Sequence, residues 1–226
     1  MYQQIIDDWA LKRSIAKDKE RGSDTGEWHP SGMVECLRAA VYSFTGTPKS
    51  DEKAARNIRI MDRGTEVHET VQGIMHAKYP DFIAEVPVRW QGFHGSADGL
   101  LPIADGVLND EVVPTYELQE YKSMSPNAKR WMKAPKEGHV KQARLYYMCL
   151  EEQGYLLEGI RIVYFDRDDW NVIEFEVEPW TPEEVEAFLT EVDVLETHAE
   201  EGTLPDRMPD DFWLCRFCDW RTTCKG

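Results

Sequence analysis

The C-terminal twelve residues carry the feature that most constrains the fold: Cys215, Cys218 and Cys224, in the spacing Cys-x2-Cys-x5-Cys. Three thiolates this close together are typical of a metal site, and a tetrahedral site needs a fourth ligand. Cys36 is the candidate, whereas Cys149 lies among apolar neighbours and is expected in the core. Because Cys36 and Cys215 are 179 positions apart (215 − 36), such a site would hold the two ends of the chain together.

A second feature is the segment 116–122, Tyr-Glu-Leu-Gln-Glu-Tyr-Lys, which alternates polar and apolar residues as a strand does. Side chains alternate between the faces of a strand, so Glu120 and Lys122 point the same way. A carboxylate can hold a hard cation and a lysine can steady a water or a developing negative charge, which suits hydrolysis of a phosphate ester. Because most Glu-x-Lys pairs are solvated surface ion pairs, this interpretation depends on the residues around it.

Four other polar residues lie in apolar surroundings on expected elements. His68 sits beside the apolar stripe of a helix expected at 62–79, as a core histidine or a metal ligand. Asp98 lies within a strand expected at 92–101, where a partner, a cation or a turn at Gly99 would explain it. Gln142 and Tyr146 are four apart on a helix expected at 137–153, so they share one face.

The remaining pattern predicts alternating strands and helices. Residues 5–20 are expected to form an amphipathic helix that buries Ile5, Ile6, Trp9, Ile15 and Ala16. Ser31 is expected to cap a helix with Cys36 in its second turn, and Thr181 one that runs to about Glu200. Strands are expected at 82–90, at a sheet edge because of Pro87, and at 158–166 and 171–178, with a loose hairpin at 104–112.

Charge is unevenly distributed along the chain. The net charge of −16 argues against a protein that coats nucleic acid without specificity. Residues 122–144 nevertheless carry a net charge of +6, and Trp131 among them could stack on a base between phosphate contacts. The alternative is a solvated helix face. The acidic helix near 183–200 is expected to face away from any nucleic acid, or to repel it from the wrong side. The candidate DNA-binding residues are Lys129, Arg130, Trp131, Lys133, Lys136, Lys141 and Arg144.

Several classes of protein are disfavoured. The first residues do not resemble a signal peptide, no apolar run approaches membrane-spanning length, and no G-x-x-x-x-G-K-[ST] phosphate loop is present. A chain of 226 residues is the size of one domain. We therefore expect a soluble, cytoplasmic, single-domain protein.

The order of these motifs resembles a known family. His68, Asp98, Glu120-x-Lys122 and Gln142-x3-Tyr146, framed by Cys36 and the C-terminal cysteines, resemble the RecB-like branch of the PD-(D/E)XK nucleases. The similarity is closer still to the iron–sulfur exonucleases of CRISPR adaptation and phage recombination and to the AddB nuclease. It extends over roughly residues 29–226.

The resemblance implies a role for each site residue. Asp98, Glu120 and the backbone carbonyl of Tyr121 would hold Mg²⁺ or Mn²⁺, and His68 would add a nitrogen ligand that favours manganese. Lys122 would orient the attacking water and neutralise charge on the phosphate, while Gln142 and Tyr146 would line the site. The implied activity is metal-dependent hydrolysis of DNA at single-stranded ends, leaving a 5′-phosphate.

The resemblance also implies the fold and a cofactor. The fold would be α/β, a restriction-endonuclease-like mixed central sheet flanked by helices, with a nuclease core at about 55–200. Cys36, Cys215, Cys218 and Cys224 would bind a 4Fe–4S cluster in a small subdomain made of about 29–50 and 202–226. Ligand count alone permits zinc equally well.

Two alternatives to an active nuclease remain. One is a catalytically idle DNA-binding or scaffold subunit of a recombination or CRISPR adaptation complex. The other is a zinc-binding interaction module on which the Glu-x-Lys pair is surface decoration. For the nuclease, the expected partners are DNA, recombination or adaptation proteins, and further copies of the chain in a homo-oligomer.

Overall fold

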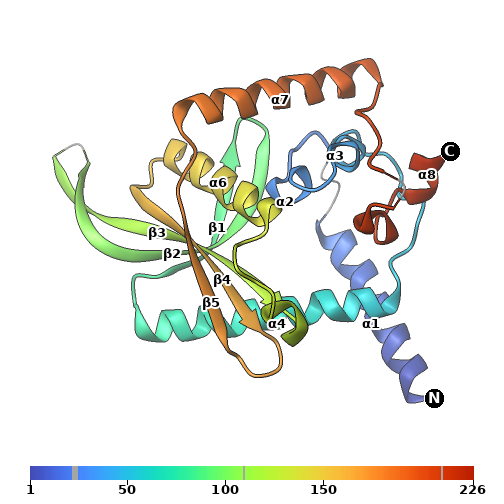
Figure 1. The fold of residues 1–226 in the computed structure, drawn as a ribbon, viewed down its shortest axis with the longest axis horizontal. Helices are drawn as coiled ribbons and strands as arrows, with labels where there is room; N and C mark the ends of the chain where they lie inside the picture. The colour runs from blue at the N-terminus through green and yellow to red at the C-terminus, as the bar shows by residue number, and fades with distance from the viewer. Residues whose placement is uncertain (22–24, 109, 210) are drawn as a thin grey trace.

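The computed structural model describes residues 1–21, 25–108, 110–209 and 211–226. Its centre is a five-stranded mixed sheet in the order β1-β2-β3-β4-β5, flanked by helices on both faces (Figure 1). The predicted α/β fold with a mixed central sheet is therefore confirmed. The strands are β1 (Ile83–Trp90), β2 (Phe93–Leu108), β3 (Glu111–Met124), β4 (Leu157–Asp166) and β5 (Val172–Val177).

The connection between β3 and β4 places the main helix of the fold. These two strands run parallel, whereas the other neighbouring pairs are antiparallel. Parallel neighbours need a long crossover, and α6 (Glu137–Glu152) provides it. The short helix α5 (Pro126–Lys129) begins the crossover, with Ser125 as its cap.

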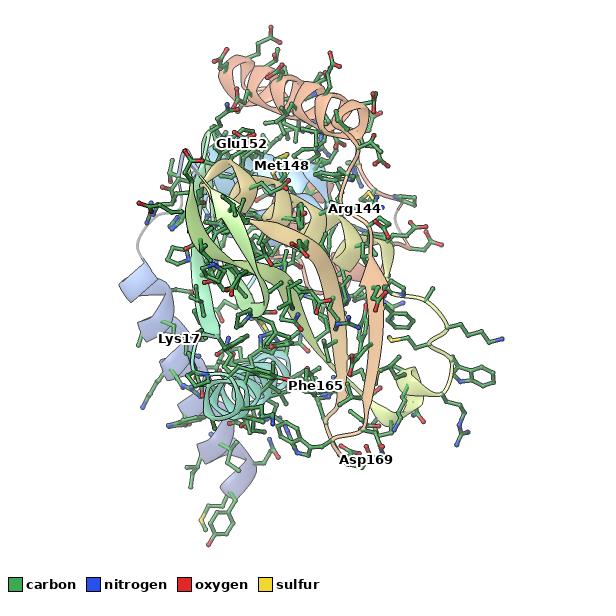
Figure 2. All side chains as sticks on the ribbon, turned by 90° about the vertical axis from the view of Figure 1, so that its left-hand side faces the viewer. Lys17, Arg144, Met148, Glu152, Phe165 and Asp169 are labelled. Atoms are coloured by element: carbon green, nitrogen blue, oxygen red, sulfur yellow. The ribbon has the colours of Figure 1, made fainter. Side chains whose placement is uncertain are left out.

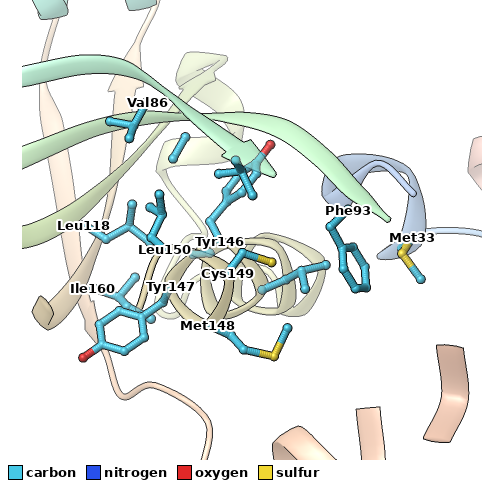
Figure 3. Close-up of a cluster of buried hydrophobic side chains, with 14 of the residues drawn as sticks. Met33, Val86, Phe93, Leu118, Tyr146, Tyr147, Met148, Cys149, Leu150 and Ile160 are labelled. Atoms are coloured by element: carbon cyan, nitrogen blue, oxygen red, sulfur yellow. The ribbon is translucent and has the colours of Figure 1, made fainter. Parts of the chain in front are cut away.

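Each face of the sheet has its own apolar cluster. The α6-side cluster joins inward residues of the sheet, such as Leu118 and Ile160, to Tyr147 and Leu150 of α6 (Figure 3). The α4-side cluster lies under α4 (Ala55–Lys78) and consists of Val67, Val71, Phe82, Tyr121, Val163 and Phe165. Cys149 is fully buried in the α6-side cluster, as predicted.

Helix α7 (Pro182–Glu201) lies outside α6 and adds Phe188, Val192 and Leu195 to the α6-side cluster. It begins with the predicted cap: the Thr181 hydroxyl accepts from the Glu184 N–H, and the Glu184 carboxylate accepts from the Thr181 N–H. The C-terminal segment follows with a 3-10 turn (Trp213–Arg216) and α8 (Arg221–Lys225).

The N-terminal helix differs from expectation. Helix α1 spans Tyr2–Arg21, but Ile5, Ile6, Trp9, Ile15 and Ala16 are exposed, and Trp9 keeps 56% of its surface. The prediction that they are core residues is wrong, because α1 crosses α4 and projects beyond it instead of covering the sheet (Figure 1). Polar contacts hold the crossing, including Lys17 to Asp62 at 3.2 Å, and Figure 2 shows Lys17 beside α4.

Two local predictions also need correction. Ser31 does not cap a helix through Cys36: α2 (Pro30–Met33) is a single turn with His29 at the N-cap position, and α3 (Leu37–Phe44) begins after Cys36. Pro30 suits the first position of a helix, so α2 starts two residues earlier than a cap at Ser31 would place it. The hairpin predicted at 104–112 is present but is regular and not loose, since β2 and β3 stay paired as far as Leu108 and Glu111 in an arm that projects from the sheet (Figure 1).

No helix among the described residues is both long and apolar enough to cross a membrane.

Candidate active site

The sheet brings the two predicted acidic residues together. The β2–β3 register pairs Gly99 with Gln119, and Asp98 and Glu120 are the next residues of the two neighbouring strands. The Asp98 carboxylate accepts a hydrogen bond from the Tyr121 N–H at 2.6 Å, which fixes it against β3 beside Glu120. Thus two acidic residues that are 22 positions apart (120 − 98) lie on neighbouring strands, close enough for the charge of Asp98 to raise the pKa of Glu120.

Lys122 and Gln142 extend the site toward α6. The Lys122 Nζ lies 2.5 Å from Glu120 Oε1 and donates a hydrogen bond to Gln142 Oε1 at 3.1 Å. Glu120 keeps 1% of its surface and Gln142 keeps 8%, so this contact is shielded from water. The prediction that Glu120 and Lys122 share a face is confirmed, and Gln142 holds the lysine from the helix above.

His68 and Tyr146 close the site from opposite sides of the sheet. His68 reaches from α4, and its Nδ1 lies 3.1 Å from Asp98 Oδ1. Tyr146 projects from α6 toward β1 and β2 (Figure 3), close enough that a Cβ on Gly95 would lie 3.3 Å from its hydroxyl. Burial and the Glu120 carboxylate raise the pKa of Tyr146, so its hydroxyl stays protonated at neutral pH.

Burial dominates the electrostatics of the carboxylate–lysine pair. It raises the pKa of Glu120 to about 7, with Lys122 opposing the shift and Asp98 adding to it. Burial by itself would lower the pKa of Lys122, but the charges of Glu120 and Asp98 outweigh it and raise that pKa. At neutral pH Lys122 is therefore charged, and the pKa of Glu120 lies well above that of an ordinary glutamate because the carboxyl is buried.

One oxygen of this site lacks a partner. Glu120 Oε2 is buried and has no hydrogen-bond partner among the described residues. A buried carboxylate oxygen without a donor is costly, and a bound cation would offset that cost. No three His, Cys, Asp or Glu side chains in the described parts of the chain are already grouped closely enough to hold a metal ion. The Asp98 and Glu120 carboxylates and the His68 imidazole are nevertheless chemically suited to bind a cation. In the structure His68 contacts Asp98, and Lys122 contacts Glu120.

The raised pKa of Glu120 gives a pH prediction for the metal-free protein. Below about pH 4.5 the carboxyl is protonated in both states; between pH 4.5 and 7 it ionises first in the unfolded chain, so folding loses stability as pH rises. The loss is on the order of 3 kcal/mol and levels off above pH 7. Urea unfolding in EDTA should show an advantage of Glu120→Gln over wild type that grows up to pH 7. An advantage independent of pH would contradict this.

Two residues beside the site went unnoticed in the sequence. The His139 Nδ1 lies 2.8 Å from the Tyr164 hydroxyl, which also accepts from the Lys136 N–H at 3.1 Å. Burial, together with Lys122 and Lys136, lowers the pKa of His139 to about 3, so its ring is neutral. The sequence could have indicated His139, because it lies three residues before Gln142 on the same expected helix and so shares a face with it.

The candidate DNA-binding residues do not form one free patch. Lys141 contacts Glu191 at 2.8 Å and Arg144 contacts Glu184 at 3.7 Å, both on α7. Figure 2 shows Arg144, Met148 and Glu152 following one another along α6 beneath α7. The acidic helix α7 packs on α6, so its carboxylates pair with these two basic residues and remove them from a free patch. Lys129 lies near Asp166 and Asp169, while Arg130, Trp131, Lys133 and Lys136 are exposed.

The C-terminal segment is joined to the segment after α3. The Trp220 Nε1 donates to the Thr47 carbonyl at 2.8 Å, and its ring stacks on Tyr42 at 5.9 Å between centroids. The Asp51 carboxylate accepts from the Thr222 N–H and hydroxyl at 2.7 and 2.9 Å. The structure thus places the C-terminus against the segment that follows Cys36.

Four cysteines line the cavity between these segments. Cys36, Cys215, Cys218 and Cys224 all border a space of about 430 Å³, and Arg38 lies 3.7 Å from the Cys224 sulfur. They stand around the cavity and are not drawn into a group that would hold a single metal ion. The predicted gathering of these residues at one place is therefore present, without showing what binds there.

Comparisons with known proteins agree with the fold and show the superfamily. The crystal structure of SSO0001 has the same fold, with a TM-score of 0.59 and 16% identity over 99% of this chain and 98% of that one. No curated protein sequence matches the chain. The sequence profile of the PD-(D/E)XK nuclease superfamily matches residues 103–225, more than half of the chain, including Glu120 and Lys122. The chain therefore belongs to the PD-(D/E)XK nuclease superfamily.

Proposed function

We propose that this protein is a metal-dependent DNA exonuclease of the RecB-like, iron–sulfur branch of its superfamily, acting at single-stranded ends. Nucleases of this superfamily usually use Mg²⁺ or Mn²⁺. The observation that carries the proposal is the buried Glu120, which contacts Lys122 while its Oε2 lacks a partner among the described residues; Asp98 is held on the N–H of the next residue, Tyr121. Burying a carboxylate with an unpartnered oxygen lowers the stability of the folded protein, and a bound cation would offset that cost.

Asp98 and Glu120 would hold the cation, assisted by the carbonyl of Tyr121 and by His68. When bound, the cation lowers the pKa of a coordinated water and neutralises charge on the scissile phosphate. Lys122 orients the attacking water and stabilises the negative charge that develops on the phosphate oxygens. Gln142 keeps the Lys122 Nζ in place through its 3.1 Å contact, and Tyr146 limits access of bulk water.

Manganese is the preferred cation in this proposal. The His68 imidazole lies beside Asp98, where it is available as a nitrogen ligand once its contact with the carboxylate is exchanged for the cation. Imidazole suits manganese better than magnesium. Binding also requires Glu120 to lose its proton, so metal affinity should rise with pH.

The DNA strand would approach along the segment between β3 and α6. Arg130, Lys133 and Lys136 are exposed there, and Trp131 keeps 77% of its surface, which leaves its ring open to stack on a base. Lys129, which lies near Asp166 and Asp169, would add a further phosphate contact. Lys141 and Arg144 would contribute less, because the carboxylates of α7 already neutralise them.

The cysteine cavity would hold a 4Fe–4S cluster in a subdomain made of about 29–50 and 202–226. All four cysteines border one cavity, and Cys-rich sites of this kind hold either zinc or an iron–sulfur cluster. The resemblance to the iron–sulfur branch of the superfamily favours the cluster. The cluster would have a structural role, fastening the two ends of the nuclease domain together.

Digestion of end-labelled single strands tests the proposed activity. With Mn²⁺ we expect progressive shortening of linear single-stranded DNA and loss of activity in EDTA, while circular single-stranded DNA resists because it has no end. Circular DNA degraded as fast as linear DNA would refute the exonuclease assignment. No degradation with any divalent cation would favour an idle scaffold subunit in a recombination or CRISPR adaptation complex.

A further inference from the structure

Glu85, on the edge strand β1, has a backbone conformation that its residue type disfavours. Its φ is +49°, in the left-handed region that side chains with a Cβ rarely occupy. The described β1–β2 ladder pairs Ala84 with Gly99 and Val86 with Ala97, but does not pair Glu85 with Asp98. The irregularity thus lies directly opposite a candidate metal ligand, and strained backbone of this kind gathers at functional sites.

The irregularity changes which face each strand presents. Ala84 packs against the α4-side cluster and Val86 belongs to the α6-side cluster, although residues two apart on a regular strand share a face. In β2, Ala97 belongs to the α6-side cluster, whereas a Cβ on Gly99 would meet the Phe82 ring of the α4-side cluster at 2.3 Å. Both strands therefore change face at Glu85 and Asp98, and this sets the direction of the Asp98 side chain.

A buried glutamine connects the two residues. The Gln72 Nε2 donates to Glu85 Oε1 at 2.7 Å and to the backbone carbonyl of Asp98 at 3.0 Å. The Ser96 hydroxyl donates to Glu85 Oε2 at 2.8 Å, so both carboxylate oxygens of Glu85 are occupied. Gln72 keeps 7% of its surface and lies one turn beyond His68 on α4. Helix α4 thus contacts the Asp98 side chain through His68 and its main chain through Gln72.

We propose that Glu85 is a positioning residue, which acts through Gln72 to hold Asp98 in the orientation that binds the divalent cation. The inference rests on the proposed function. Its two oxygens accept hydrogen bonds from Gln72 and Ser96, and through Gln72 Glu85 is connected to the main chain of Asp98. Partners of this kind typically change metal affinity or activity by about 10- to 100-fold when removed.

The test compares Glu85→Gly with Glu85→Gln. Glycine accepts the positive φ without strain, so Glu85→Gly removes the hydrogen bonds and leaves the backbone conformation accessible. We expect its kcat and its Mn²⁺ affinity, measured by calorimetry, each to fall by about 10- to 100-fold, with KM for DNA changed less than about twofold. Glu85→Gln keeps an acceptor for Gln72 and should remain within about threefold of wild type. Gln72→Leu should reproduce the defect of Glu85→Gly.

The matched control is Glu174→Gly, an exposed strand glutamate on β5, which should leave kcat and Mn²⁺ affinity unchanged. Wild-type kcat and Mn²⁺ affinity in a folded Glu85→Gly variant would overturn the inference, as would Glu85→Gln being as impaired as Glu85→Gly. If Glu85→Gly does not fold, Gln72→Leu decides in the same way. An inactive wild-type protein would count against the proposed function, whereas the calorimetry of Mn²⁺ would still test the role of Glu85.

Discussion

Replacing Glu120 with glutamine is expected to reduce DNA cleavage by at least about 1,000-fold. The substitution removes the negative charge that would hold the cation and keeps the size of the side chain in a site with 1% exposure. The same variant should be more stable than wild type without metal at pH 8, because burial disfavours the ionised Glu120 carboxylate. Cleavage of labelled single strands in Mn²⁺ and thermal unfolding in EDTA measure the two effects.

Glu117→Gln is the matched control for this variant. Glu117 lies three positions earlier on β3, and its carboxylate makes two hydrogen bonds to Arg161, both at 2.8 Å. This variant should keep cleavage within about twofold and lose some stability, the reverse of the Glu120→Gln pattern. Cleavage by purified Glu120→Gln at more than a tenth of the wild-type rate would refute the assignment of Glu120.

The second large effect is expected at the cysteine cavity. Replacing Cys36 with serine should abolish the brown colour and the absorbance near roughly 400 nm that an iron–sulfur cluster gives. The cluster would close a loop of 179 residues, and by analogy with a disulfide over a long loop its loss should cost about 5 kcal/mol. For a chain of this size that corresponds to a fall in Tm of about 10–20 °C. Anaerobic purification, absorbance and thermal unfolding measure it.

Cys149→Ala is the control for Cys36→Ser, because it removes a cysteine that does not border the cavity. Cys149 is fully buried in the core, so alanine there should lower Tm slightly and leave the colour unchanged. A colourless wild-type protein with one zinc ion per chain would instead identify the cavity as a zinc site. Full absorbance in Cys36→Ser would show that Cys36 is not a ligand.

The sequence was sufficient where the signal was local or where a polar residue lay in an apolar pattern. The alternation around Glu120 and Lys122 gave both the strand and the shared face. Asp98 drew attention because a carboxylate in an apolar strand needs a partner, and the Tyr121 N–H is one of its partners. The Thr181 cap was predictable because it is a local feature, whose hydrogen bonds connect residues three positions apart.

The sequence was insufficient where tertiary contacts decide the outcome. Helical periodicity located α1 but could not show that nothing among the described residues covers Ile5 and Trp9. The spacing of Lys141 and Arg144 could not show that α7 packs beside them and neutralises their charge. The sequence could not single out Glu85, because its proposed positioning role depends on a positive φ and on a hydrogen bond from Gln72, thirteen positions earlier in the chain.

The central claim is that Asp98 and Glu120 share one divalent cation. Crystals soaked in Mn²⁺ and measured at the manganese absorption edge test it most directly. The account predicts an anomalous peak between the Asp98 and Glu120 carboxylates, with the His68 ring turned toward it and Lys122 displaced from Glu120. An enzyme that cleaves DNA in Mn²⁺ while its anomalous peak lies away from both carboxylates would contradict the account.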